Sequence, residues 1–232
     1  MALIMDTALL LHGFAGTAGS WDAFSKQLDH ERYRPLAVDL RGHGQNGAAR
    51  PISFELCVAD LLAEAPPRFT LVGYSLGGRL ALQVALAAPE RLERLVLVST
   101  SAGIEDAAER QARLDRDVAL AGRIEVESIA QFAQSWLSGP LFRDDSAKIN
   151  RAARKEIEKN SPDGLACALR SLFQVGDAEY LGPTTPPTGD RGYTGGNFGI
   201  PIGEYPGGGD QPLLASYTDS FETLTCPLDR ED

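Results

Sequence analysis

The sequence predicts an α/β protein built on a mostly parallel sheet, and three observations lead to that class. Short, almost wholly apolar runs alternate with amphipathic stretches through the first half of the chain, which is the pattern of strands wrapped by helices. A middle stretch, 104–160, keeps helical spacing and contains no strand-like run. After Gly176 both periodicities stop. We therefore expect a core, a helical insertion and a tail of different character.

The predicted strands are apolar at nearly every position, as expected of strands that are buried on both faces of a sheet. They lie at 8–11, 35–38, 69–72 and 95–98. Helical spacing predicts a helix at 20–28, with Ser20 as its N-cap, and another at 76–88, which Pro89 ends.

The helical insertion follows the fourth predicted strand. Its helices are expected at 107–120, 128–137 and 146–159, and a last helix at 164–173 returns the chain to the core. We assign residues 1–103 to the first part of the core, 104–162 to a helical cap over an active site, and 163–176 to the return helix.

Residues 177–232 form an acidic tail rich in glycine and proline. They hold ten of the 32 acidic residues of the chain but two of its 22 basic residues, together with ten glycines and seven prolines. Such a segment buries too little apolar surface to offset its ordering entropy, so we expect it to be disordered. An acidic tail on a chain of net charge −10 repels nucleic acid, so no nucleic-acid partner is expected.

The chain contains no run of eighteen apolar residues, and its N-terminus has no basic segment ahead of an apolar stretch. We therefore expect no membrane association and a cytoplasmic location. The cysteines, Cys57, Cys167 and Cys226, lack metal-ligand or redox spacing and are expected to be reduced thiols. No cofactor or metal is expected, and a monomer is the predicted state.

The motif Gly-Tyr-Ser-Leu-Gly at 73–77 joins a predicted strand to a predicted helix. In that context G-x-S-x-G predicts the nucleophile turn of the α/β-hydrolase fold, with Ser75 as the catalytic nucleophile. The helix N-terminus behind it favours developing negative charge. The N–H groups of Leu76 and of Phe14, in the loop after the first strand, are expected to form the oxyanion hole. The alternative is a glycine-rich turn with an incidental serine.

Histidine residues are few, and all of them precede the nucleophile. The fold places its catalytic base after the last strand, so His12 and His43 are interpreted as loop-shaping residues and His30 as a solvated one. No histidine follows His43, and no strand after the cap holds an acidic residue. We therefore expect the triad aspartate and histidine, and the C-terminal strands that carry them in this fold, to be missing.

Several motifs together resemble the 2-succinyl-6-hydroxy-2,4-cyclohexadiene-1-carboxylate synthase family of menaquinone biosynthesis. They are Leu-His-Gly-Phe at 11–14, Asp-Leu-Arg-Gly-His-Gly at 39–44, Gly-Tyr-Ser-Leu-Gly-Gly-Arg at 73–79, the segment 108–117, Trp136, Pro-Leu-Phe at 140–142, and the segment 160–165. The resemblance covers about residues 8–176. It implies a lyase that eliminates pyruvate from 2-succinyl-5-enolpyruvyl-6-hydroxy-3-cyclohexene-1-carboxylate without a cofactor.

The resemblance also implies a site for a small-molecule polycarboxylate, and guanidinium groups suit such a ligand. Arg79 lies four residues past Ser75, so it is expected near the same side of the following helix, one turn on. Arg113 matches a substrate-binding arginine of the family, and Lys159 stands where the family usually has arginine. The alternative for both cations is a solvated helix position. Two aromatic residues complete the implied site: Trp136, which packs on substrate unless it is ordinary cap core, and Tyr74 of the pocket.

Three functions remain open from the sequence. The first is the lyase, inactive or impaired in this chain because Ser75 lacks its triad partners. The second is a carboxylic-ester hydrolase, although a small neutral ester would gain nothing from Arg79 and Arg113. The third is a non-catalytic binding protein on a degenerate hydrolase scaffold. The tail is explained either by a frameshifted reading of the true C-terminal third or by a genuine degenerate paralogue.

Overall fold

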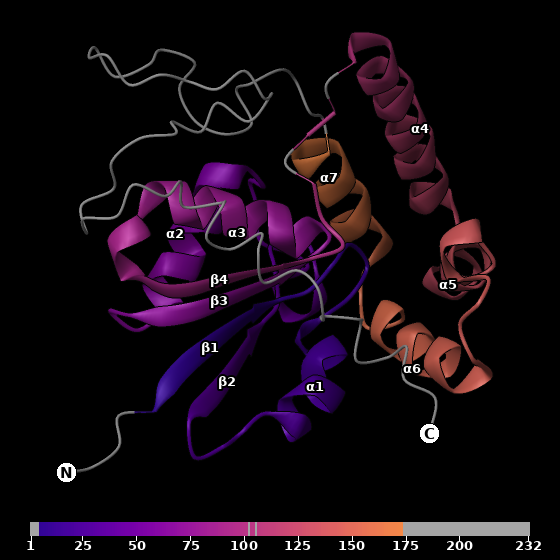
Figure 1. Ribbon diagram of the computed structural model, residues 1–232. Helices are drawn as coiled ribbons and strands as arrows, with labels where there is room; N and C mark the ends of the chain where they lie inside the picture. The colour runs from indigo at the N-terminus through magenta and orange to yellow at the C-terminus, as the bar shows by residue number, and fades with distance from the viewer. Residues whose placement is uncertain (1–4, 102, 105, 174–232) are drawn as a thin grey trace, which may run out of the picture.

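The computed structural model describes residues 5–101, 103–104 and 106–173, and a parallel sheet lies at its centre (Figure 1). The strands, in the spatial order β2-β1-β3-β4, are β1 (Asp6–Leu11), β2 (Tyr33–Val38), β3 (Phe69–Tyr74) and β4 (Leu92–Val98). The structure confirms the four predicted strands and lengthens each by two or three residues. The tail predicted at 177–232 lies outside the described residues.

The register of the sheet explains why its strands are apolar on both sides. Leu9 of β1 stands beside Leu71 of β3, and Leu10 stands beside Val72. Successive side chains of a strand point to opposite faces. Leu9 and Leu71 therefore join the larger hydrophobic cluster, while Leu10 and Val72 pack with Trp21 in a smaller cluster on the other face.

Helices cover both faces of the sheet (Figure 1). On one face lie α2 (Phe54–Glu64) and α3 (Leu76–Ala87), which ends before Pro89 as predicted. On the other lies α1 (Asp22–Gln27), which follows a 3-10 turn at Ala18–Trp21. The expected N-cap at Ser20 is wrong: Thr17 caps this segment, because its side chain accepts the N–H of Gly19, and Ser20 occupies the third position of a capping box.

The predicted cap consists of helices, each begun by a polar N-cap side chain. They are α4 (Ala107–Val126), α5 (Ile129–Leu137) and α6 (Ala147–Ile157), capped by Asp106, Ser128 and Ser146. α4 runs six residues past its predicted end at 120. The return helix, α7 (Pro162–Leu172), is capped by Ser161 and has proline at its first position, where a missing N–H costs nothing.

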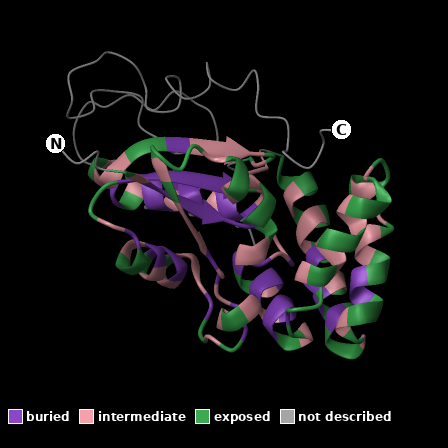
Figure 2. Cartoon of the chain, turned by 90° about the horizontal axis from the view of Figure 1, so that it is seen from below, coloured by how far each residue is buried: buried purple, intermediate pink, exposed green. Residues whose placement is uncertain are grey.

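Cap and core share one hydrophobic interior. Ile124 of α4 and Phe132 of α5 are fully buried in the same cluster as Leu165 and Leu169 of α7. Figure 1 shows α4 and α7 side by side, and Figure 2 shows the buried strands and the exposed outer faces of the cap helices. No helix among the described residues is long and apolar enough to span a membrane.

Candidate active site

Ser75 lies on a strained turn between β3 and α3. Its φ is 51° and its ψ −112°, a left-handed backbone conformation that L-residues rarely adopt. Two contacts from the end of β4 hold the turn: the Ser75 N–H donates to Val98 O at 2.9 Å, and Thr100 Oγ1 donates to Ser75 O at 2.8 Å. The geometry is that expected of a G-x-S-x-G nucleophile turn.

Glycine is required where the turn meets the end of β1. A Cβ on Gly77 would lie 2.2 Å from Leu11 O, and one on Gly13 would lie 2.8 Å from the Tyr74 ring. Both approaches are closer than any side chain tolerates. The loop after β1 therefore packs directly against the nucleophile turn, with Tyr74 partly exposed at its rim and Ser75 half-buried beside it.

The two expected oxyanion donors lie on these adjoining segments. Leu76 is the first residue of α3, and the N–H groups of a first helical turn have no partner within their helix. Phe14 precedes Ala15, whose φ of 62° turns the loop sharply. The carbonyl of Ala15 accepts a hydrogen bond of 2.9 Å from Asn160 Nδ2. Their role as an oxyanion hole stays a prediction.

Phe14 also links the core to the cap. Its ring makes edge contacts with Trp136 at 5.6 Å, Phe173 at 5.4 Å and His43 at 5.8 Å, between centroids. Trp136 is only partly buried, so it covers Phe14 as a cap residue without being sealed in the core. Phe14 thus connects the loop after β1 to cap helix α5 and to the end of α7.

Two of the histidines, His12 and His43, are buried, and their rings form hydrogen bonds with backbone groups of the loops after β1 and β2. The Leu40 N–H donates to His12 Nε2 at 3.1 Å, so the proton sits on Nδ1, which donates to Gly13 O at 2.8 Å. His43 Nδ1 contacts Arg41 O at 3.1 Å, and burial, aided by His12, lowers the pKa of His43 to about 3. Burial likewise lowers the pKa of His12.

The remaining histidine is remote from the nucleophile. His30 lies just before β2, at the end of the parallel sheet opposite to Ser75, which follows β3. No histidine of the described residues is therefore arranged to take a proton from Ser75. The same residues contain no group of three or more His, Cys, Asp or Glu side chains that could hold a metal ion.

Arg79 and Arg113 converge on one aromatic ring. Arg79 comes from α3 and Arg113 from cap helix α4, and their guanidinium carbons lie 5.3 and 5.4 Å from the centroid of the Phe173 ring. Both distances are in the range of cation–π attraction. Arg113 Nε also donates to Asp117 Oδ2 at 2.7 Å. The structure thus brings together the two cations predicted from the sequence, through a residue that the sequence did not single out.

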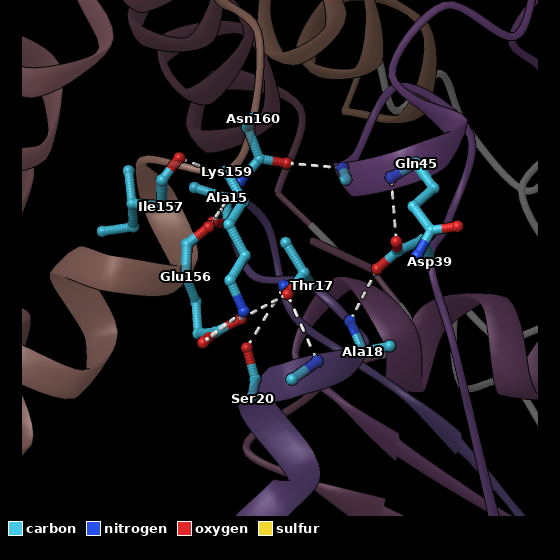
Figure 3. A network of polar contacts seen from close by, with 12 residues as sticks. Ala15, Thr17, Ala18, Ser20, Asp39, Gln45, Glu156, Ile157, Lys159 and Asn160 are labelled. Carbon is cyan, nitrogen blue, oxygen red and sulfur yellow. Dashed lines mark hydrogen bonds and ion pairs between the residues drawn. The ribbon is translucent and has the colours of Figure 1, made fainter.

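Lys159 belongs to a different set of contacts, shown in Figure 3. Its Nζ pairs with both oxygens of Glu156, at 2.7 and 2.8 Å, and its side chain is more than half exposed. Glu156 also accepts the hydroxyl of Thr17, at the start of the 3-10 turn before α1. Lys159 therefore stands at the junction of α6 with the core, paired with a carboxylate.

Asn160 is the centre of this junction (Figure 3). Its Oδ1 accepts the N–H of Gly44 at 2.9 Å, and its Nδ2 donates to the carbonyls of Ala15, Glu156 and Ile157. The side chain is 5% exposed. One buried amide thus joins the end of the cap to the loops after β1 and β2, and sequence reasoning missed it because its partners are 116 and 145 residues away.

Comparison with known proteins identifies the class. A family model described as the alpha/beta hydrolase fold matches residues 8–164, which is more than half of the chain, so the chain belongs to that family.

Two curated relatives and one solved structure narrow the resemblance. A 2-succinyl-6-hydroxy-2,4-cyclohexadiene-1-carboxylate synthase from Serratia proteamaculans is 31% identical over 75% of this chain and 69% of its own length. A pimeloyl-[acyl-carrier protein] methyl ester esterase from Aliivibrio salmonicida is 30% identical over 77% and 70%. The structure of MenH from S. aureus superposes with a TM-score of 0.64 at 27% identity, covering 74% and 68%.

The resemblance to the 2-succinyl-6-hydroxy-2,4-cyclohexadiene-1-carboxylate synthase family is therefore confirmed. The chain spans about two thirds of the length of the relatives that it matches.

Proposed function

We propose that this protein binds a polycarboxylate between core and cap. We further infer that the reaction for which this site is built is the elimination of pyruvate from 2-succinyl-5-enolpyruvyl-6-hydroxy-3-cyclohexene-1-carboxylate. The observation that carries the proposal is the convergence of Arg79 and Arg113 on Phe173, in contact with Phe14 beside the nucleophile turn. Two cations at that place suit a ligand with several carboxylates.

In the proposed reaction a ring C–H bond and the C–O bond to the enolpyruvyl group break, and a C=C bond forms. The proton goes to a base, and the enolpyruvyl group leaves with the electron pair of the C–O bond as the enolate of pyruvate, which becomes pyruvate when it takes up a proton. Ser75 would promote removal of the proton, and the N–H groups of Phe14 and Leu76 would stabilise developing oxyanion charge. Tyr74 would line the pocket, Trp136 would cover the ring, and Lys159 would release Glu156 to bind a third carboxylate.

We further propose that the 232-residue chain binds its ligand but turns it over poorly. A serine hydroxyl needs an adjacent base, and both nitrogens of His12 are already committed to backbone groups. His43 is sealed within an aromatic cluster and holds a backbone carbonyl. Recruiting either histidine would require the loops after β1 and β2 to unfold.

An ester hydrolase is the second candidate, because the esterase relative is as similar as the synthase relatives. The two functions differ in what they require of the cations. A neutral ester gains nothing from the arginine pair, whereas a polycarboxylate depends on it.

The test is ligand binding by isothermal titration calorimetry on the full chain. The probe is 2-succinylbenzoate, a dicarboxylate that resembles the product named for the relatives, and its dimethyl ester is the neutral control. We expect binding of the dicarboxylate alone, weakened at least tenfold in Arg113→Ala. Arg123→Ala, which removes an exposed arginine elsewhere on α4, should bind like the parent chain. Equal binding of acid and ester, or equal losses in both variants, would rule out the carboxylate site.

Turnover is measured in parallel, with the enolpyruvyl substrate and with an aryl ester. We expect rates far below those of a complete family member on both. Turnover comparable to such an enzyme, and abolished by Ser75→Ala, would show that a base reaches Ser75 and would refute the proposed impairment.

A further inference from the structure

Asp117 is a buried carboxylate for which the proposed reaction has no use. It lies on cap helix α4, one turn past Arg113, and its side chain is 9% exposed. The carboxylate of Asp115, two residues earlier, is exposed and accepts a hydrogen bond from Gln111. Asp115 and Asp117 thus lie on the same helix, but Asp115 faces solvent and Asp117 faces the interior.

The charged groups around Asp117 are arginines. Arg113 and Arg116 come from α4 itself, and Arg79 comes from α3. Despite these cations, burial is the dominant influence and raises the pKa of Asp117. A buried ion pair is weak evidence of stability, because the desolvation of its charges offsets their attraction, so a role other than stabilising the fold is open to this residue.

We propose that Asp117 is an affinity-setting residue, an internal counter-anion whose negative charge opposes the binding of ligand carboxylates at the arginine pair. The inference rests on the proposed function, since it takes Arg79 and Arg113 as the carboxylate site. It assigns the Arg113–Asp117 contact a role in binding rather than in holding the cap together.

The geometry of the Arg113–Asp117 contact determines whether removing the charge of Asp117 strengthens or weakens ligand binding. The contact uses Nε of Arg113, which leaves the edge formed by Nη1 and Nη2 to a ligand carboxylate. A carboxylate on that edge would lie about 7 Å from Asp117, where two like charges still repel appreciably in a half-buried site. Replacing Asp117 by asparagine removes this repulsion and keeps an oxygen that accepts the Nε–H, so most of the orientation of Arg113 survives. Loss of the charge should therefore tighten binding.

The test compares Asp117→Asn with the matched control Asp115→Asn, which makes the same chemical change on the exposed side of α4. Binding of 2-succinylbenzoate to the full chain is measured by calorimetry, and the free energy of unfolding at pH 7 by urea titration. We expect Asp117→Asn to bind about tenfold more tightly, an effect of the size given by one like charge at this distance. It should be at least as stable as the parent. Asp115→Asn should change neither quantity.

The outcomes separate this inference from the proposed function. Should Asp117→Asn bind as weakly as the parent or more weakly, while Arg113→Ala still loses affinity, the counter-anion role is wrong and the carboxylate site stands. A stability loss in Asp117→Asn that accompanies weaker binding would make Asp117 a structural ion-pair partner, which also overturns the inference. If neither the parent nor Asp117→Asn binds the dicarboxylate, both the inference and the proposed function fail.

Discussion

The buried amide of Asn160 offers the sharpest test of how the cap is fixed to the core. Asn160→Ala removes the acceptor of the Gly44 N–H and the donor to Ala15 O, both in loops that border the site. The donor bonds to the carbonyls of Glu156 and Ile157, at the end of α6, are lost with them.

The magnitude follows from the number of buried groups that lose a partner. Each buried donor or acceptor left unsatisfied costs about 1–3 kcal/mol. Only the two groups of Gly44 and Ala15 are counted, because water can replace the bonds at the helix end. We therefore expect Asn160→Ala to lower the free energy of unfolding by about 2–6 kcal/mol. The assay is urea denaturation of the full chain, followed by tryptophan fluorescence.

Asn150→Ala is the matched control, because Asn150 lies on α6 and makes a single long bond of 3.4 Å to Asp145 O. We expect it to cost less than about 1 kcal/mol. If both variants lose the same free energy of unfolding, the proposal that Asn160 joins the cap to the core is wrong.

Three further predictions concern the glycine contacts, the buried histidines and the strained serine. Gly77→Ala should abolish soluble folded protein, since its Cβ would meet Leu11 O at 2.2 Å, whereas Gly122→Ala, with open space around it on α4, should raise the melting temperature slightly. Because burial lowers the pKa of His43 to about 3, the folded state resists protonation of this ring, so the associated stability is full above pH 6.5 and is lost as the pH falls toward 3. Over that range, the free energy of unfolding of His43→Gln should depend less steeply on pH than that of the parent. Ser75→Gly should raise the free energy of unfolding by about 1 kcal/mol, because glycine adopts a φ of 51° without strain, and a variant no more stable than the parent would show that the turn is not strained.

Local patterns sufficed to predict the strands and the nucleophile turn. The strand at 69–72 and the glycines at 73 and 77 carry their information within a few residues, since burial on both faces and a tight turn each demand particular side chains at adjacent positions. The placement of Arg79 and Arg113 near one another could also be predicted, because the family resemblance assigns both positions to the substrate site.

Features that depend on distant partners were not predictable in this way. Helix α2 was missed because its sequence, Phe-Glu-Leu-Cys-Val-Ala-Asp-Leu-Leu-Ala-Glu, is apolar around much of its circumference and shows no clean polar face. Phe173 reads as the end of an ordinary helix, and its position between two arginines arises only when α7 packs beside α4. Asn160 likewise reads as a helix-ending residue.

The contacts around Ser75 and those around the arginine pair share helix α3, whose Arg79 N–H donates to Ser75 O, but they otherwise depend on different side chains, and this bears on the proposed loss of turnover. The strained turn is held by β4 and by the loop after β1, through Val98, Thr100 and Gly13. The arginines are held by Phe173 and Asp117, from α7 and α4. Neither set includes a histidine that could take a proton from Ser75, so both can persist whether or not Ser75 is activated. We therefore expect binding and catalysis to be separable in this chain, with a ligand affinity that responds to Arg113→Ala but not to Ser75→Ala.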